Sequence, residues 1–166
     1  MPVNFFDERA KTNSSNTQFG LCDDPPPAKN PAYIDEYDQT KWIGIVSNQA
    51  RKSIDFYPID NCIPVMKANN ELERRCDGML RFESSLFFVE LKTGEKGWLG
   101  VGREQLTISI QKFQQNHDLS TFTKIEAFIC NSSRPVSKSN YMIEIQKFKN
   151  DTGYVLNVQQ KIEIDK

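Results

Sequence analysis

Short apolar runs separated by polar connections follow one another from residue 42 onward, and most show the two-residue alternation of β-strands. Residues 42–46 and 53–57 flank a polar, basic connection, which predicts a β-hairpin. Residues 74–82 and 86–92 flank a short turn at residues 83–85 and predict a second hairpin, whose later strand is the more apolar one. We therefore expect a sheet in this part of the chain.

The region that follows combines a helical pattern with a further strand. Between residues 103 and 116, apolar side chains recur at i, i+4 and i+7, at positions Leu106, Ile110 and Phe113. This spacing predicts an amphipathic helix whose apolar face packs on a sheet. Residues 123–130 alternate again and predict another strand.

The C-terminal region holds a strong turn signal at residues 150–153, which read Asn-Asp-Thr-Gly. Residues 141–148 and 154–164 flank this turn and predict a third hairpin. The order of strands, helix and strand is that of a mixed α/β (α+β) domain with a mixed central sheet and a flanking amphipathic helix.

Residues 1–40 differ in composition from the rest of the chain. They hold five of the eight prolines, and their three basic and seven acidic side chains give a charge of −4, whereas residues 41–166 carry +3 from 18 basic and 15 acidic side chains. Prolines 25–27 cannot lie inside a helix or a central strand. We predict a partly irregular, proline-rich acidic lead-in at residues 1–40, before a single domain at residues 41–166. One hypothesis is that this arm covers a basic face of the domain.

The composition limits the classes of protein to consider. A chain of 166 residues fits about one domain. A net charge of −1 argues against a strongly basic packaging protein. The single histidine, His117, excludes a two-histidine zinc site, and its place at a helix end favours capping over catalysis.

Targeting signals are not evident in the sequence. We find no secretory signal and no apolar run of membrane-spanning length, so we expect a soluble, cytoplasmic protein without membrane contacts. The cysteines form no C-x-x-C pair, which favours buried, reduced thiols at Cys22, Cys62, Cys76 and Cys130.

Ionisable residues gather on the second predicted hairpin. Because side chains alternate along a strand, Glu90 and Lys92 emerge on one face while Leu91 points the other way. The turn at residues 83–85 pairs the two strands and places Asp77 roughly opposite Glu90. Two carboxylates so placed suit Mg²⁺ or Mn²⁺ together with water and a substrate phosphate, and a neighbouring ammonium group stabilises charge in phosphodiester hydrolysis.

At these residues the chain resembles the PD-(D/E)XK phosphodiesterases, which are nucleases of the restriction-endonuclease-like fold. The resemblance rests on Asp77-Gly78, on residues 89–92 (Val-Glu-Leu-Lys) and on Gln105 at the start of the next helix, and it spans residues 71–113. It implies a metal ion held by Asp77, Glu90 and the carbonyl group of Leu91, with Lys92 assisting the attacking water and Gln105 as an accessory polar residue.

Two departures from the family pattern stand out. Cys76 occupies the position of the family's proline, and no helix precedes the sheet to supply a further acidic residue. Candidates for that third acid are Asp60, Glu71 and Glu73. The glycine-rich stretch at residues 94–102 lacks the spacing of a phosphate-binding loop, so we expect it to form a rim beside the site.

The implied partner is nucleic acid, with DNA favoured over RNA, and a homodimer would allow two strands to be cut. Basic and aromatic residues near the motif are candidates for contacts with phosphates and bases, namely Arg74, Arg75, Arg81, Lys96, Trp98 and Arg103. The alternative function is that of a catalytically inactive nuclease-fold module, which binds a protein or a nucleic acid and keeps Asp77, Glu90 and Lys92 as an ion-pair cluster.

Overall fold

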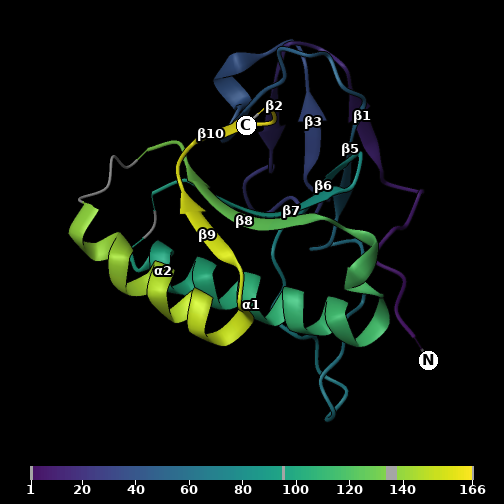
Figure 1. The fold of residues 1–166 in the computed structure, drawn as a ribbon, viewed down its shortest axis with the longest axis vertical. Coiled ribbons are helices and arrows are strands. Elements are labelled where there is room, and N and C mark those ends of the chain that lie inside the picture. Colours follow the sequence, from purple (N-terminus) through teal and green to yellow (C-terminus); the bar gives the residue numbers. More distant parts are fainter. Residues whose placement is uncertain (1, 95, 134–137, 166) are drawn as a thin grey trace.

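The computed structural model describes residues 2–94, 96–133 and 138–165. It contains three layers, in which a pair of helices covers one face of a large sheet and a smaller sheet covers the other face (Figure 1). The predicted mixed α/β (α+β) fold is confirmed. Within the described residues, no helix has the length and apolar content that crossing a membrane requires.

The large sheet has six strands in the order β1-β5-β6-β7-β8-β9. Its first four strands pair antiparallel, whereas β7, β8 and β9 run parallel to one another. Helix α1 (Trp98–Asn116) connects β7 to β8, and helix α2 (Lys138–Thr152) connects β8 to β9. The strands are β1 (Thr12–Ser14), β5 (Ile54–Pro58), β6 (Gly78–Phe82), β7 (Ser85–Lys92), β8 (Lys124–Asn131) and β9 (Val155–Val158).

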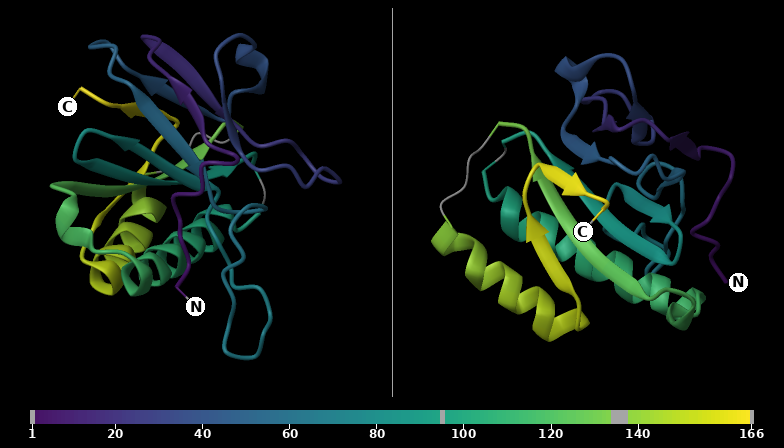
Figure 2. Two further views of the ribbon diagram at one scale, coloured as in Figure 1. Left: turned by 90° about the vertical axis from the view of Figure 1, so that its right-hand side faces the viewer. Right: turned by 45° about the horizontal axis from the view of Figure 1, so that its top comes forward.

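The small sheet has four strands in the order β10-β4-β2-β3 and packs against the large sheet from the side opposite the helices (Figure 2). Strand β10 pairs parallel with β4, whereas β2 pairs antiparallel with both β4 and β3. Its strands are β2 (Gln18–Cys22), β3 (Tyr33–Asp35), β4 (Gly44–Ser47) and β10 (Lys161–Glu163), and short 3-10 turns lie at Gln39–Lys41 and Leu119–Thr121.

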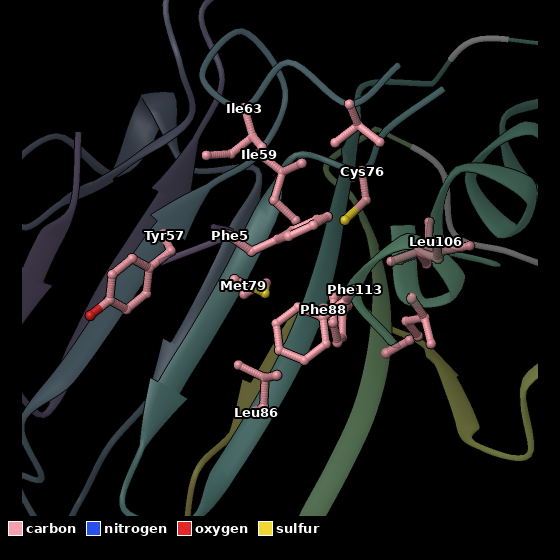
Figure 3. Packing of buried hydrophobic residues seen from close by; sticks show 14 of the residues in the cluster. Phe5, Tyr57, Ile59, Ile63, Cys76, Met79, Leu86, Phe88, Leu106 and Phe113 are labelled. Carbon is pink, nitrogen blue, oxygen red and sulfur yellow. The ribbon is translucent and has the colours of Figure 1, made fainter. Parts of the chain in front are cut away.

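Strand β7 is buried on both faces because it lies between two hydrophobic cores. Leu86 and Phe88 face the helices, in the core that Figure 3 shows with Phe113 of α1. Phe87 and Val89 point the other way, into the core between the sheets. A strand covered on both sides positions its side chains rigidly, and Glu90 continues its helix-facing row.

The second predicted hairpin is confirmed, because β6 and β7 pair antiparallel with Gly78 opposite Val89 and Phe82 opposite Ser85. The first is wrong. Residues 42–46 contribute to β4 in the small sheet, and residues 53–57 contribute to β5 in the large sheet. The polar connection crosses between the sheets. There, Nδ2 of the buried Asn48 donates hydrogen bonds to the backbone carbonyl groups of Asn16 and Lys52.

The third predicted hairpin is also wrong, because residues 141–148 belong to α2. The apolar residues Tyr141, Ile145 and Phe148 have the i, i+4 and i+7 spacing of a helix, and Phe148 is fully buried against the helix-side core. Gly153 ends the helix with a φ of 83° and donates its N–H to the carbonyl group of Lys149. The predicted helix at residues 103–116 is confirmed but begins earlier, at Trp98.

The first 40 residues hold more regular structure than their prolines indicate. Strands β1, β2 and β3 lie there, and Phe5 and Phe19 are fully buried in the two cores. A segment with such burial is part of the folded body, so it is not an arm that lifts away from a face. The cysteines are free, and Cys22, Cys76 and Cys130 are buried as predicted, whereas Cys62 is only partly buried.

Candidate active site

Two buried carboxylates face one another at the end of the β6–β7 hairpin. Asp77 precedes β6, and the hairpin register places it opposite Glu90 of β7. The backbone N–H of Asp77 donates to Oε1 of Glu90 at 3.1 Å, and the backbone N–H of Leu91 donates to Oδ2 of Asp77 at 2.7 Å. Each carboxylate is thus held by the backbone of the opposite strand. Their relative exposures are only 6% and 2%.

Gly78 explains why glycine follows the aspartate. A Cβ atom at this position would lie 2.4 Å from the ring of Phe56 and 2.8 Å from the carbonyl oxygen of Tyr57. Strand β5 can therefore approach β6 closely only if residue 78 has no side chain. The close packing fixes the start of β6 and, with it, the position of Asp77.

Lys92 lies beside Glu90 on the same face of β7, as predicted. Its Nζ is 3.0 Å from Oε2 of Glu90 and donates to Oε1 of Gln105 at 2.9 Å. Gln105 lies on α1, and its Nε2 donates to the backbone carbonyl of Arg75 at 3.2 Å. Gln105 thereby connects the lysine to the segment that precedes Asp77.

Burial dominates the electrostatics of the two carboxylates. It raises the pKa of Glu90 to about 7, although the positive charge of Lys92 acts in the opposite direction. The pKa of Asp77 is raised well above its ordinary value, first by burial and then by the negative charges of Glu90 and Asp23. A cation beside this pair would offset both the burial and the mutual repulsion.

A cavity of about 630 Å³ opens onto these residues and has two walls. We call one the hairpin wall, which consists of Asp77, residues 90–93 and Gln105. The other, the N-terminal wall, consists of residues 22–26 and 40–43. The N-terminal wall follows β2 on one side and includes the connection from β3 to β4 on the other, so the small sheet carries it.

The sequence analysis did not predict the N-terminal wall or its charged residues, Asp23, Asp24 and Lys41. Asp23 lies close enough to Asp77 for a side-chain hydrogen bond, and its own pKa is raised by burial and by the charge of Asp60. Asp24 accepts a hydrogen bond from the Tyr33 hydroxyl at 2.8 Å. No local pattern marks these residues as functional, apart from two adjacent aspartates before three prolines.

Of the three candidates for a third acid, the structure brings only Asp60 to the cavity, where its Oδ1 is 3.0 Å from Arg75. Glu71 and Glu73 belong to the connection between β5 and β6, which projects from the body (Figure 2). Glu71 is exposed there, and its Oε2 is 3.9 Å from Nζ of Lys67.

Six candidates for nucleic-acid contacts, all within the described residues, lie outside the cavity lining. Three arginines have acidic partners: Arg74 pairs with Glu104, Arg75 with Asp60, and Arg103 with Glu144. Arg81 lies over the rings of two phenylalanines. Lys96 is exposed, and Trp98 packs against the helix-side core at the start of α1.

The remaining expectations concern the helix. His117 caps α1 through its backbone N–H, and its Nε2 accepts a hydrogen bond from the backbone N–H of Phe5 at 3.0 Å. This residue is structural, as predicted. The glycine-rich stretch lies only partly in a loop, because α1 already includes Gly100 and Gly102.

The donor set is compatible with a magnesium-type ion. Within the described residues, no group of three or more His, Cys, Asp or Glu side chains is arranged to hold a metal ion. Mg²⁺, however, is commonly held by one or two carboxylates and completes its shell with water and substrate phosphate. Asp77 and Glu90 supply that number of carboxylates, and Leu91 also lines the cavity.

No protein-family model, curated protein or solved structure matches this chain.

Proposed function

We propose that this protein is a metal-dependent phosphodiesterase of the PD-(D/E)XK type that acts on nucleic acid. One observation carries the proposal. Asp77, Glu90 and Lys92 lie together on the hairpin and line a cavity. Two buried carboxylates are held by backbone N–H groups, and Nζ of Lys92 lies 3.0 Å from Oε2 of Glu90. Burying these charged groups lowers the stability of the folded protein, and such clusters are typical of functional sites.

Each residue has a chemical role in the proposed reaction. Asp77 and Glu90 would hold Mg²⁺ or Mn²⁺, which polarises a phosphoryl oxygen and lowers the pKa of a bound water when present. Lys92 donates a hydrogen bond to the attacking water or to the phosphate oxygen on which negative charge develops. Gln105 is a positioning residue, because it holds the lysine by the 2.9 Å hydrogen bond.

The proposal is tested by hydrolysis of bis(4-nitrophenyl) phosphate, a small phosphodiester, in the presence of Mn²⁺. Asp77→Asn and Lys92→Gln should each lower kcat/KM at least about 100-fold, since each removes a charge that acts on the transition state. Lys147→Gln is the matched control, because Lys147 is exposed on α2 and lies outside the cavity lining.

The alternative function is the inactive binding module. The same ion pair between Lys92 and Glu90 would serve there as a structural contact. Equal residual hydrolysis in the wild type and in both site variants would favour this alternative over the phosphodiesterase.

A further inference from the structure

We propose that the cavity admits one strand of nucleic acid and excludes a duplex, and that Lys41 holds the entering strand. This inference rests on the proposed function and adds its substrate class. It follows from the cavity lining, to which both the N-terminal wall and the hairpin wall contribute.

The first observation is the size of the cavity. About 630 Å³ lies in the range that suits a drug-sized ligand, which corresponds to about one or two nucleotides. A phosphate must enter this space to reach Asp77 and Glu90, because these carboxylates are only 6% and 2% exposed. One flexible strand can place a phosphate there with its bases unstacked, whereas a stacked duplex cannot enter without displacing a wall.

The second observation is the charge of the N-terminal wall. Asp23 and Asp24 lie on it, with Asp60 nearby in the cavity lining. Carboxylates at this place repel the phosphates of a second strand held beside the first. A single strand can bind Lys41, Lys92 and the proposed metal ion. A duplex would also bring its second strand against these carboxylates.

The third observation is the placement of the basic residues. The arginines near the motif are paired with acids or packed on aromatic rings, and none of the four lines the cavity. Duplex-binding proteins hold the backbones by many lysine and arginine contacts. Within the described residues, the basic side chains that line this cavity are Lys41 and Lys92.

Lys41 is suited to hold the strand outside the reaction centre. It is exposed on the N-terminal wall, and its Nζ lies 5.7 Å above the centre of the Tyr33 ring. Lys92 belongs to the hairpin wall and is engaged with Glu90 and Gln105. Because Lys41 and Lys92 line the same cavity, Lys41 can bind another phosphate of the strand whose reacting phosphate lies at Lys92.

The test compares three substrates with Mn²⁺ and the full chain. They are a DNA oligonucleotide, the same oligonucleotide annealed to its complement, and bis(4-nitrophenyl) phosphate. We expect kcat/KM for the single strand to exceed that for the duplex by at least about tenfold, or about 1.4 kcal/mol. Lys41→Gln should raise KM for the single strand about fivefold while kcat changes less, and Lys147→Gln should match the wild type.

The outcomes separate the inference from the proposed function. Equal hydrolysis of single strand and duplex would overturn the inference and leave the phosphodiesterase intact. A Lys41→Gln variant with the KM of the control would overturn the role of Lys41. If bis(4-nitrophenyl) phosphate and both DNA forms stay uncleaved, the proposed function itself is wrong.

Discussion

The two walls of the cavity differ in how the chain builds them. The hairpin wall comes mainly from residues joined by one short turn, and backbone hydrogen bonds between adjacent strands fix its carboxylates. The N-terminal wall comes from two segments, one at the end of β2 and one just before β4, which the small sheet holds against the large one. In the proposed function, the first wall carries the reactive groups and the second limits which substrates reach them.

The proposed chemistry thus depends on residues close in sequence, whereas the proposed limit on access depends on segments far apart in the chain. Strand alternation and a turn suffice to bring Asp77, Glu90 and Lys92 together. Asp23 reaches the same cavity only because β2 packs in a second layer, more than fifty positions away in sequence from Asp77.

The largest effect concerns the cost of ionising Glu90. The folded protein keeps this proton up to about pH 7, whereas an unfolded chain releases it near the ordinary value of 4.5. The folded state therefore binds more protons between these values, and the free energy of unfolding falls as pH rises through this window. The difference in pKa corresponds to about 3 kcal/mol.

Glu90→Gln isolates this contribution, because glutamine keeps the shape and has no proton to release. In urea unfolding with EDTA, we expect the variant and the wild type to be about equally stable at pH 4.5, and the variant to be more stable at pH 8. The lowered pKa of His117 acts in the opposite direction but is common to both proteins. A variant less stable than the wild type at pH 8 would mean that the pairing of Glu90 with Lys92 outweighs its burial.

The second prediction compares two glycines, Gly78 next to Asp77 of the hairpin wall and Gly20 next to Trp42 of the N-terminal wall. Gly78→Ala places a Cβ against Phe56 of the large sheet, and Gly20→Ala places one 2.0 Å from the ring of Trp42 in the N-terminal wall. Each substitution should cost about 1–3 kcal/mol of stability through overpacking, measured by thermal or urea unfolding.

Their effects on hydrolysis should differ. Gly78→Ala displaces the strand that carries Asp77, so hydrolysis of bis(4-nitrophenyl) phosphate should fall at least about tenfold. Gly20→Ala displaces Trp42 and should keep this hydrolysis while weakening the preference for single-stranded DNA. Equal losses of small-substrate hydrolysis in both variants would show that the two walls act as one unit.

The same contrast explains what could be predicted from the sequence. The β6–β7 hairpin, helix α1 and strand β8 have strong local patterns, and all three were predicted correctly. The pairing of residues 42–46 with residues 53–57 was wrong, because a polar connection that joins two sheets has the same pattern as a hairpin turn. Residues 141–148 were assigned to a strand because a turn signal follows at residues 150–153, but that signal marks the end of helix α2 at Gly153.

The third prediction concerns Gln105, which belongs to the hairpin wall but lies on α1. Gln105→Leu removes the acceptor for Lys92 and should lower kcat about tenfold, or about 1.4 kcal/mol. Gln105→Glu keeps an oxygen for the lysine and should recover most of the rate, as measured with bis(4-nitrophenyl) phosphate. A merely structural glutamine would show no such recovery, since its hydrogen bond to Arg75 is lost in both variants.

The smallest effect tests whether the N-terminal wall contributes to cation binding. Asp23 faces Asp77, so its negative charge favours a cation held by Asp77 and Glu90. At pH 8, Asp23→Asn should weaken Mn²⁺ binding about fivefold, or about 1 kcal/mol, which is the interaction of two nearby unit charges in water. Calorimetric titration with Mn²⁺ measures this change without a substrate.

Glu71→Gln is the control for this measurement, because Glu71 lies on the exposed connection between β5 and β6 and outside the cavity lining. The control should bind Mn²⁺ like the wild type. If Asp23→Asn also binds like the wild type, the third acid of the site does not come from Asp23, and the N-terminal wall acts on access alone. If Glu71→Gln weakens binding equally, the effect reflects net charge, and neither wall is specific for the cation.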